Sequence, residues 1–441
     1  MRSSCRSLAQ FHRLQKPWSE EEGQHGSGRT LAGQVLYLTV AGMWPRGRGT
    51  PYLMYVALVQ LCAVSYVAVG LVSIHTARGD VNSISYTLLH TLEVFSGMVK
   101  AGLFFSKRLS FYRLVRDLDL MASDYLDRPE LESARRWARR MTVSLSAYIF
   151  VVILLWLPTP LLAGGDQKML PMVQIHGVDW SQWPQAYAAL YALQCAVPLT
   201  QVPIVIGLDG FFVAAMLYVG ALLQLMGQRV SGLRLAGDGA ADLSGDAGLK
   251  MRQMLYAELS ACINSHQKIT KFLRDLESAM SAMVLVQLSS TMLNLCMGLY
   301  HQTKIRDVLT AMQYAMILPF YSSQIYFYCW TADAITQQVG LNYVTSKSWS
   351  CLRGYMPTLA LQWHRCRCDE CGAGLSLAAY SSCWVGAGTS FQKALSILMA
   401  RAHKPLVITA GRLYPINTAA FVALMKASYS YYTLLRQLDS N

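Results

Sequence analysis

Four potential metal ligands lie close together in one short segment of the chain: His364, Cys366, Cys368 and Cys371. Imidazole and thiolate groups are ligands that zinc prefers. Their crowded spacing fits no standard zinc motif, so we expect no metal site and no cofactor. The sequence also contains no G-x-S-x-G, H-E-x-x-H or phosphate-loop motif. It therefore predicts no catalytic residues and no enzyme.

Two further groups of polar residues lie inside apolar stretches. His90 and Glu93 are three residues apart, so on a helix they share one face and can pair; we assign them no acid–base chemistry. Near the C-terminus, Lys426 and Ser430 interrupt residues 414–435. Polar groups in a membrane span usually face a bundle interior or a water-filled path. The last segment is therefore either a pore-lining helix or a helix packed inside a bundle.

The elements that must position these residues are membrane helices. The 441-residue chain is 53% hydrophobic and only 14% charged, whereas globular proteins average about 25% charged residues. Apolar segments long enough to span a bilayer cover residues 51–74, 81–105, 141–163, 186–226, 280–300, 308–332 and 414–435. Residues 186–226 hold a single charge, Asp209, so they form either one long helix or two spans folded at Asp209 and Gly210.

The distribution of basic residues decides between these two topologies. The net charge is +13, and Lys and Arg concentrate in alternate gaps between the apolar segments. If residues 186–226 cross once, all the basic gaps lie on one side, as the positive-inside rule requires. The sequence thus predicts an all-α membrane protein with seven transmembrane helices, a cytoplasmic N-terminus and an extracellular C-terminus.

Other functional classes fit this topology less well. A G-protein-coupled receptor has the opposite orientation, and its Asp-Arg-Tyr and Asn-Pro-x-x-Tyr motifs are absent. A transporter is a further alternative, although we detect no inverted repeat. Nucleic acid is not expected as a partner, because the charge does not gather on a soluble face. The basic gaps either bind membrane lipid or form solvated helix extensions.

Several motifs resemble those of insect odorant receptors. Residues 405–411 (Pro-Leu-Val-Ile-Thr-Ala-Gly) and 424–436 are similar to the C-terminal signature of that family. Three shorter matches are Val-Ala-Gly-Met-Trp-Pro at 40–45, Tyr-Cys-Trp at 328–330, and Tyr380 with Ser382 and Trp384. The resemblance covers roughly residues 31–338 and 374–438.

The resemblance implies an odorant-gated, non-selective cation channel subunit in the plasma membrane of an olfactory neuron dendrite. Such a tuning subunit binds a small volatile odorant and assembles with the odorant receptor co-receptor into a heterotetramer. In that family the odorant lies in the outer half of the bundle, which implies the ligand-binding residues Tyr86, His90, Trp156, Gln194, Val197 and Tyr314. The last helix lines the pore, which implies Ala427, Ser430, Leu434, Gln437 and Leu438, with Leu434 as a hydrophobic gate.

We divide the chain into five regions on this basis. Residues 1–30 are a disordered cytoplasmic tail, and residues 31–338 form spans one to six with cytoplasmic helix extensions. Residues 339–373 are an insert absent from the family, for which we favour an unspliced intron over a genuine segment. Residues 374–413 are a cytoplasmic anchor region, and residues 414–438 are the pore-lining last span.

Overall fold

The computed structural model describes residues 30–44, 50–77, 79–162, 169–233, 246–305, 308–339, 375–382, 384, 387–402, 404 and 406–440. Nearly all of the predicted tail at residues 1–30 and of the predicted insert at residues 339–373 lies outside these residues. The candidate zinc ligands from His364 to Cys371 lie outside them as well.

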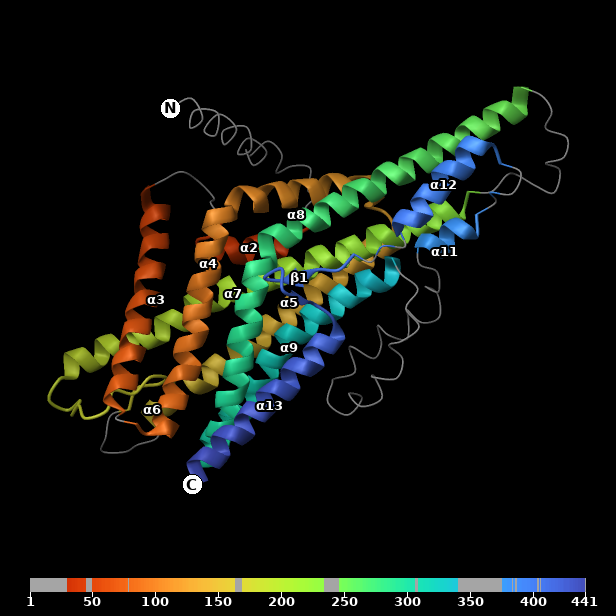
Figure 1. Cartoon of the computed structure of the whole chain (residues 1–441). Coiled ribbons are helices and arrows are strands. Elements are labelled where there is room, and N and C mark those ends of the chain that lie inside the picture. The colour runs from red at the N-terminus through yellow and green to blue at the C-terminus, as the bar shows by residue number, and fades with distance from the viewer. Residues whose placement is uncertain are drawn as a thin grey trace, which may run out of the picture.

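The described chain is almost entirely helical (Figure 1), which confirms the predicted all-α fold. The helices are α2 (Ala32–Val40), α3 (Thr50–Thr76), α4 (Val81–Ala122), α5 (Pro129–Trp156), α6 (Thr159–Leu162), α7 (Pro184–Ser231), α8 (Asp246–Lys304), α9 (Val308–Val339), α11 (Leu375–Tyr380), α12 (Thr389–Ala402) and α13 (Thr418–Ser440), with a 3-10 turn at Ser123–Tyr125. Two short strands, β1 (Thr409–Ala410) and β2 (Tyr414–Pro415), form an antiparallel pair.

Five helices in the described part of the chain are long and apolar enough to cross a membrane: α3, α4, α5, α7 and α8. The other two predicted spans correspond to α9 and α13. They are more polar, because α9 carries Gln313 and Gln324 and α13 carries Lys426. Asp80 begins α4 and accepts hydrogen bonds from Ser83 and from the Asn82 N–H. These bonds hold the pKa of Asp80 below its ordinary value, and the bond from the Ser83 hydroxyl has the largest effect.

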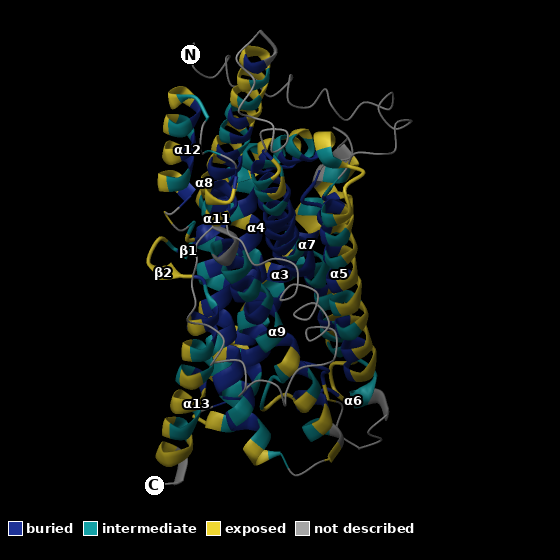
Figure 2. Cartoon of the chain, turned by 90° about the vertical axis from the view of Figure 1, so that its right-hand side faces the viewer, coloured by how far each residue is buried: buried dark blue, intermediate teal, exposed yellow. Residues whose placement is uncertain are grey.

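The helix α7 organises the bundle. It is a single helix of 48 residues that continues through Asp209 and Gly210, so the predicted single crossing is confirmed and the two-span alternative is wrong. At 1.5 Å per residue it is roughly 72 Å long, which exceeds the ~30 Å hydrocarbon core. It contacts α2, α3, α4, α5, α8, α9 and α11, and most of its second half is buried (Figure 2).

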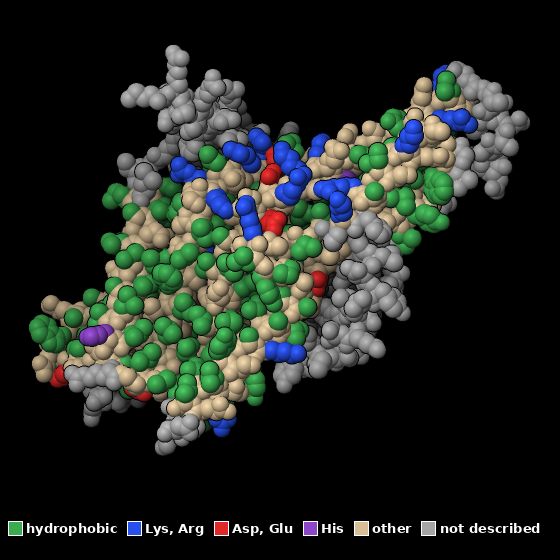
Figure 3. All heavy atoms as spheres, viewed as in Figure 1, with side chains coloured by type: hydrophobic (Ala, Val, Ile, Leu, Met, Phe, Trp, Pro, Cys, Tyr) green, Lys and Arg blue, Asp and Glu red, His purple; other side chains and the backbone are tan. Residues whose placement is uncertain are grey.

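Charge separates along the bundle. Lys and Arg side chains gather at one end, over α4 and α8, whereas hydrophobic side chains dominate the middle and the opposite end (Figure 3). The basic end also holds α11 and α12, and the C-terminal end of α13 lies at the other end (Figure 1). The two ends of the bundle therefore differ in basic charge, as the alternate basic gaps of the sequence predict.

The predicted start of the last span at residue 414 is wrong, because α13 begins at Thr418. Tyr414 and Pro415 form β2 instead, and Asn417 begins the helix by accepting a hydrogen bond from the Ala420 N–H at 2.7 Å. The hairpin turns through Gly411 and Arg412, both at positive φ. A Cβ at Gly411 would lie 2.5 Å from Leu285 of α8, so glycine permits both the turn and the close packing.

Candidate ligand-binding site

A cavity of about 90 Å³ lies among α4, α5, α7 and α9, with α3 and the segment before α7 contributing one residue each. Its lining is mostly apolar and aromatic: Tyr66, His90, Glu93, Val94, Ile149, Val152, Ile153, Trp156, Met172, Pro198, Gln201, Val202, Val205, Ile317, Phe320 and Tyr321. An apolar cavity with a few polar groups is the usual form of a small-molecule site.

Four of the six predicted ligand-binding residues form one aromatic cluster beside this cavity. The His90 ring lies 5.1 Å from both the Tyr86 and the Trp156 ring, and Trp156 lies 5.1 Å from Tyr314. The structure adds His301, 4.6 Å from Tyr314, which the sequence analysis missed. His90 and Trp156 line the cavity itself, whereas Tyr86 and Tyr314 pack behind them.

The other two predicted residues do not line the cavity. The Gln194 side chain accepts hydrogen bonds from the N–H groups of Met172 and Val173 and donates one to the Val173 carbonyl. Both its oxygen and its nitrogen are therefore bonded to the segment before α7. Val197 is buried in a hydrophobic cluster with Tyr66 and Val173. Their assignment as ligand-binding residues stays a prediction, made without the segment before α7 to which Gln194 bonds.

The polar groups of the cavity are incompletely paired. Gln201 is 5% exposed, and neither atom of its amide has a hydrogen-bond partner among the described residues; the same is true of His90 Nε2. Glu93 Oε2 accepts a hydrogen bond from Asn294 Nδ2 at 3.1 Å. The sequence analysis missed Gln201, although a glutamine within the apolar 186–226 stretch was a usable signal.

A second polar cluster, the ion-pair network, lies deeper in the bundle. Lys100 is fully buried, and its Nζ lies 2.9 Å from Asp209 Oδ1. The Tyr328 hydroxyl donates to the same oxygen at 2.6 Å. Lys100 also donates to Gln287 Oε1, and Gln287 Nε2 donates to Gln324 Oε1 at 2.7 Å. Four helices, α4, α7, α8 and α9, are thus joined through charged and amide side chains.

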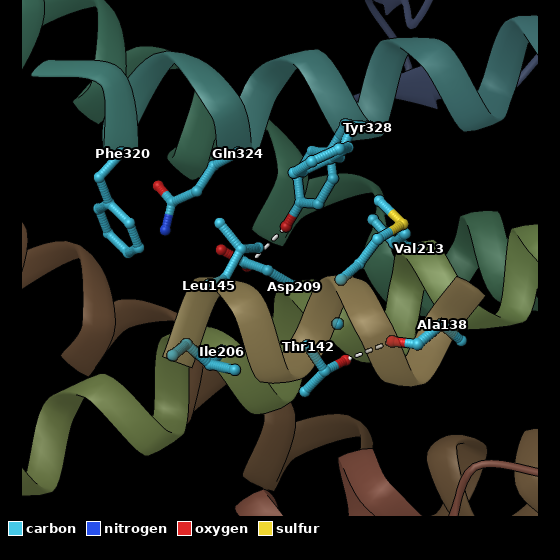
Figure 4. A pocket seen from close by; sticks show the side chains of 12 residues that line it. Ala138, Thr142, Leu145, Ile206, Asp209, Val213, Phe320, Gln324 and Tyr328 are labelled. Carbon is cyan, nitrogen blue, oxygen red and sulfur yellow. Dashed lines mark hydrogen bonds between the residues drawn. The ribbon is translucent and has the colours of Figure 1, made fainter. Parts of the chain in front are cut away.

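A small hollow of about 30 Å³ borders this network (Figure 4). Phe320, Gln324 and Tyr328 line it from α9, and Tyr328 points toward Asp209 of α7 (Figure 4). Thr142 of α5 lines it as well, with its hydroxyl bonded to the Ala138 carbonyl. Phe320 is the residue common to the linings of this hollow and of the larger cavity.

The predicted pore residues lie along the outer side of α13. Ser430 is exposed, Leu434 is 50% exposed and Leu438 is 67% exposed, whereas Ser428 on the opposite side is buried. Ala427 is half-buried and Gln437 is exposed. The spacing of these five residues places them on one stripe of the helix, which is exposed or half-buried among the described residues.

The helix α9 connects the cavity to α13. Near one end it carries Tyr314 and Phe320, and near the other end Asp333 Oδ2 accepts a hydrogen bond from the Thr418 N–H at 2.8 Å. Thr418 is the first residue of α13, so a carboxylate of α9 holds the start of that helix. The rings of Tyr326 and Phe421 pack beside it, with centroids 5.7 Å apart.

Comparison with known proteins places this arrangement in a family. The family model described as 7tm odorant receptor matches residues 80–341 and 367–429. Odorant receptor Or2 of Anopheles gambiae is 25% identical over 70% of this chain and 72% of its own length. Odorant receptor 10 of Aedes albopictus is 25% identical over 60% of this chain and 59% of its own length.

Solved structures give the same fold. The olfactory receptor OR5 from Machilis hrabei superposes with a TM-score of 0.69 at 15% identity, over 92% of this chain and 97% of that chain. The same receptor in complex with eugenol gives a TM-score of 0.66 over the same shares. The seven-helix membrane architecture predicted from the sequence is therefore confirmed. With a family match that covers most of the chain, the protein belongs to the insect odorant receptor family.

Proposed function

We propose that this chain is the ligand-binding subunit of an odorant-gated, non-selective cation channel. The observation that carries the proposal is the position of α9, which lines the cavity with Phe320 and Tyr321 and holds the first residue of α13 with Asp333. A ligand that displaces α9 at the cavity changes the position of a carboxylate that anchors α13. The same helix thus connects a binding event to a candidate pore.

The cavity suits a small volatile ligand. Its volume of about 90 Å³ is below the ≈ 300–1,000 Å³ usual for drug-sized ligands, so a ligand must be small or must move the surrounding rings. Trp156, Tyr66 and Tyr321 offer large apolar faces for dispersion contacts. The eugenol complex of OR5 from Machilis hrabei supports binding of a small molecule by this fold.

The exposed stripe of α13 supports an oligomeric pore. Leu434 and Leu438 face outward in a single chain, and a ring of such side chains around a shared axis would close a pore by dewetting. We propose Ala427, Ser430, Leu434, Gln437 and Leu438 as pore residues, and the odorant receptor co-receptor as the partner that completes a heterotetramer. The basic end of the bundle then faces the cytoplasm of an olfactory neuron dendrite.

The test is co-expression with the co-receptor in oocytes, with currents recorded across a panel of volatile compounds. We expect inward cation currents that require both chains. A lack of current for every compound, at confirmed surface expression, contradicts the proposal. An N-terminal tag that antibodies reach only after permeabilisation would support the proposed orientation, whereas a tag accessible in intact cells would favour the alternative of a G-protein-coupled receptor.

The region at residues 339–373 requires a control in this experiment. The family match is interrupted between residues 341 and 367, inside the region that we propose is a retained intron. Recordings should therefore compare the full chain with a variant in which residue 338 is joined to residue 374. Sequencing of transcripts across this junction tests the intron proposal directly, and a dominant message that contains these residues contradicts it.

A further inference from the structure

The hydrogen-bonding groups of the cavity restrict the chemical class of its ligand. We infer that the cavity selects small ligands with a hydroxyl group on an apolar body, alcohols or phenols, and that Gln201 is the residue that recognises the hydroxyl. This inference rests on the proposed function, because it concerns the ligand of the same site. It assigns a role to Gln201, which the sequence motifs do not single out.

The side chain of Gln201 presents both a donor and an acceptor without partners. It is 5% exposed, and both Nε2 and Oε1 lack hydrogen bonds within the described residues. Buried polar groups are nearly always paired in native proteins, and the few exceptions need an explanation. A bound ligand that supplies the missing partners is such an explanation, because Gln201 lines the cavity.

The position of Gln201 is set by a glycine on the facing helix. A Cβ at Gly97 of α4 would lie 2.7 Å from Gln201 Oε1, which is closer than real Cβ contacts. A side chain at position 97 therefore requires the end of the Gln201 side chain to shift. Gly97 lies four residues after Glu93, so the two residues share a face of α4. Glu93 and Gln201 both line the cavity, so the carboxyl group and the amide border the same space.

A hydroxyl group satisfies this arrangement better than a polar group that only accepts or only donates. It donates one hydrogen bond and accepts others, so it can donate to Gln201 Oε1 or to Glu93 and accept from Gln201 Nε2. An ether, ester or ketone only accepts and leaves Gln201 Oε1 unpaired. A protonated amine only donates and leaves Nε2 unpaired.

The other cavity residues hold the apolar part of the ligand. Val94, Ile153 and Val205 supply aliphatic surface, and Trp156, Phe320 and Tyr321 supply aromatic rings. These groups contact hydrocarbon of any kind and do not distinguish an alcohol from an ether of the same size. Discrimination therefore depends on the polar groups. Sites built to bond a hydroxyl reject analogues without one strongly, because their own buried groups are then left unpaired.

The experiment uses two isomers of equal size, hexanol and pentyl methyl ether, on the full chain co-expressed with the co-receptor. We expect hexanol to activate currents at a concentration at least roughly tenfold lower than the ether. In Gln201→Leu, which is close in shape but apolar, we expect this preference to fall to about twofold or less. Equal potency of the two isomers on the unmodified chain overturns the inference without any variant.

Two further variants separate a specific effect from a general one. Thr200→Val changes the adjacent residue, whose hydroxyl bonds to carbonyls of its own helix, and should keep the tenfold preference. Gly97→Ala displaces the Gln201 amide without removing it and should lose the preference. Persistence of the preference in Gln201→Leu overturns the inference.

A binding measurement distinguishes failure of this inference from failure of the proposed function. Ligands that bind the folded state raise thermal stability, so the purified receptor complex is heated with each isomer and no current is required. Stabilisation by hexanol and not by the ether supports the inference even if no current is observed. Equal stabilisation by both isomers, together with normal odorant currents, overturns the inference and leaves the channel proposal intact.

Discussion

Two polar clusters lie within the same helical bundle, and they differ in how completely their groups are paired. In the ion-pair network, Lys100, Asp209 and Tyr328 share short hydrogen bonds across three helices. In the cavity, Gln201 and His90 keep polar atoms without partners. The network has one such atom as well, Asp209 Oδ2, but each of its side chains has at least one partner, whereas both atoms of the Gln201 amide have none among the described residues. Paired groups fix the positions of helices, and on our proposal the unpaired amide is the group that a ligand completes.

The largest expected effect breaks the paired cluster. Lys100→Met leaves the Asp209 carboxylate buried without its cation, and removal of one partner of a buried pair costs about 3–5 kcal/mol. We expect a severe loss of surface expression, measured by labelling of intact cells. The matched control is Lys107→Met, because Lys107 is half-buried on the same helix and, among the described residues, bonds to the Ser278 carbonyl rather than to a carboxylate.

A double variant tests whether the loss arises from the unpaired charge. Lys100→Met combined with Asp209→Leu replaces both charges with apolar groups, and such replacements are often neutral. We expect expression to recover in part, because the Tyr328 hydroxyl still loses its acceptor. A double variant that expresses no better than Lys100→Met would show that the pair is not what stabilises this part of the bundle.

The boundary between the two clusters is the ring of Phe320. Phe320→Leu removes ring volume between the cavity and the small hollow, at a cost in stability that grows with the space left behind. We expect the preferred alcohol to become longer by one or two carbons, measured as relative potency across a series of straight-chain alcohols. Phe150→Leu on the exposed side of α5 should leave the order of the series unchanged; an unchanged order in Phe320→Leu would place the ligand elsewhere.

The link from both clusters to the last helix is Asp333. Asp333→Ala removes the acceptor of the Thr418 N–H, and loss of such a cap costs about 1 kcal/mol. We expect a smaller maximal current with little change in the half-activating odorant concentration, whereas Asp333→Asn, which keeps an acceptor oxygen, should behave almost normally. A shift in odorant potency without a change in maximal current would contradict a role in transmission.

The smallest effect concerns the residues behind the cavity. The Tyr86 hydroxyl donates a long hydrogen bond, 3.3 Å, to the Pro171 carbonyl. Tyr86→Phe should therefore cost about 0.5 kcal/mol of stability, with less than about a threefold change in odorant potency, measured in the same oocyte recordings. A tenfold change would show that the hydroxyl contacts the ligand, and Tyr86 would then belong to the lining.

The sequence predicted the fold well because membrane helices are defined by local composition and charge. The single crossing of α7 was predicted from the basic residues in the gaps between spans. The helix is continuous even though it contains the charged residue Asp209. The start of α13 was missed because Tyr414 and Pro415 pair with β1, a contact that hydropathy does not reveal. The ion-pair network was missed because Lys100 and Asp209 are 109 residues apart, and pairing across helices depends on rotation and depth that local composition leaves open.

The candidate site likewise contains residues that the sequence predicted and residues that it did not. Tyr86, His90, Trp156 and Tyr314 are brought together, since helical spacing and depth placed them at one level of the bundle. Gln194 was predicted to contact the ligand because it lies at a suitable depth in the membrane. In the structure its amide bonds to Met172 and Val173, in the segment before α7. Gln201 lies two turns further along the same helix and was passed over, because only the facing Gly97 shows why its side chain enters the cavity.

The three hydrogen bonds of Gln194 have a consequence for the speed of the response. They fix Met172 and Val173, and among the described residues Met172 alone lines the cavity from outside the helices. If a bound molecule leaves past Met172, these bonds must break first, and their lifetime then contributes to the residence time. The recovery of a neuron after an odour pulse would in that case depend on a glutamine outside the cavity lining.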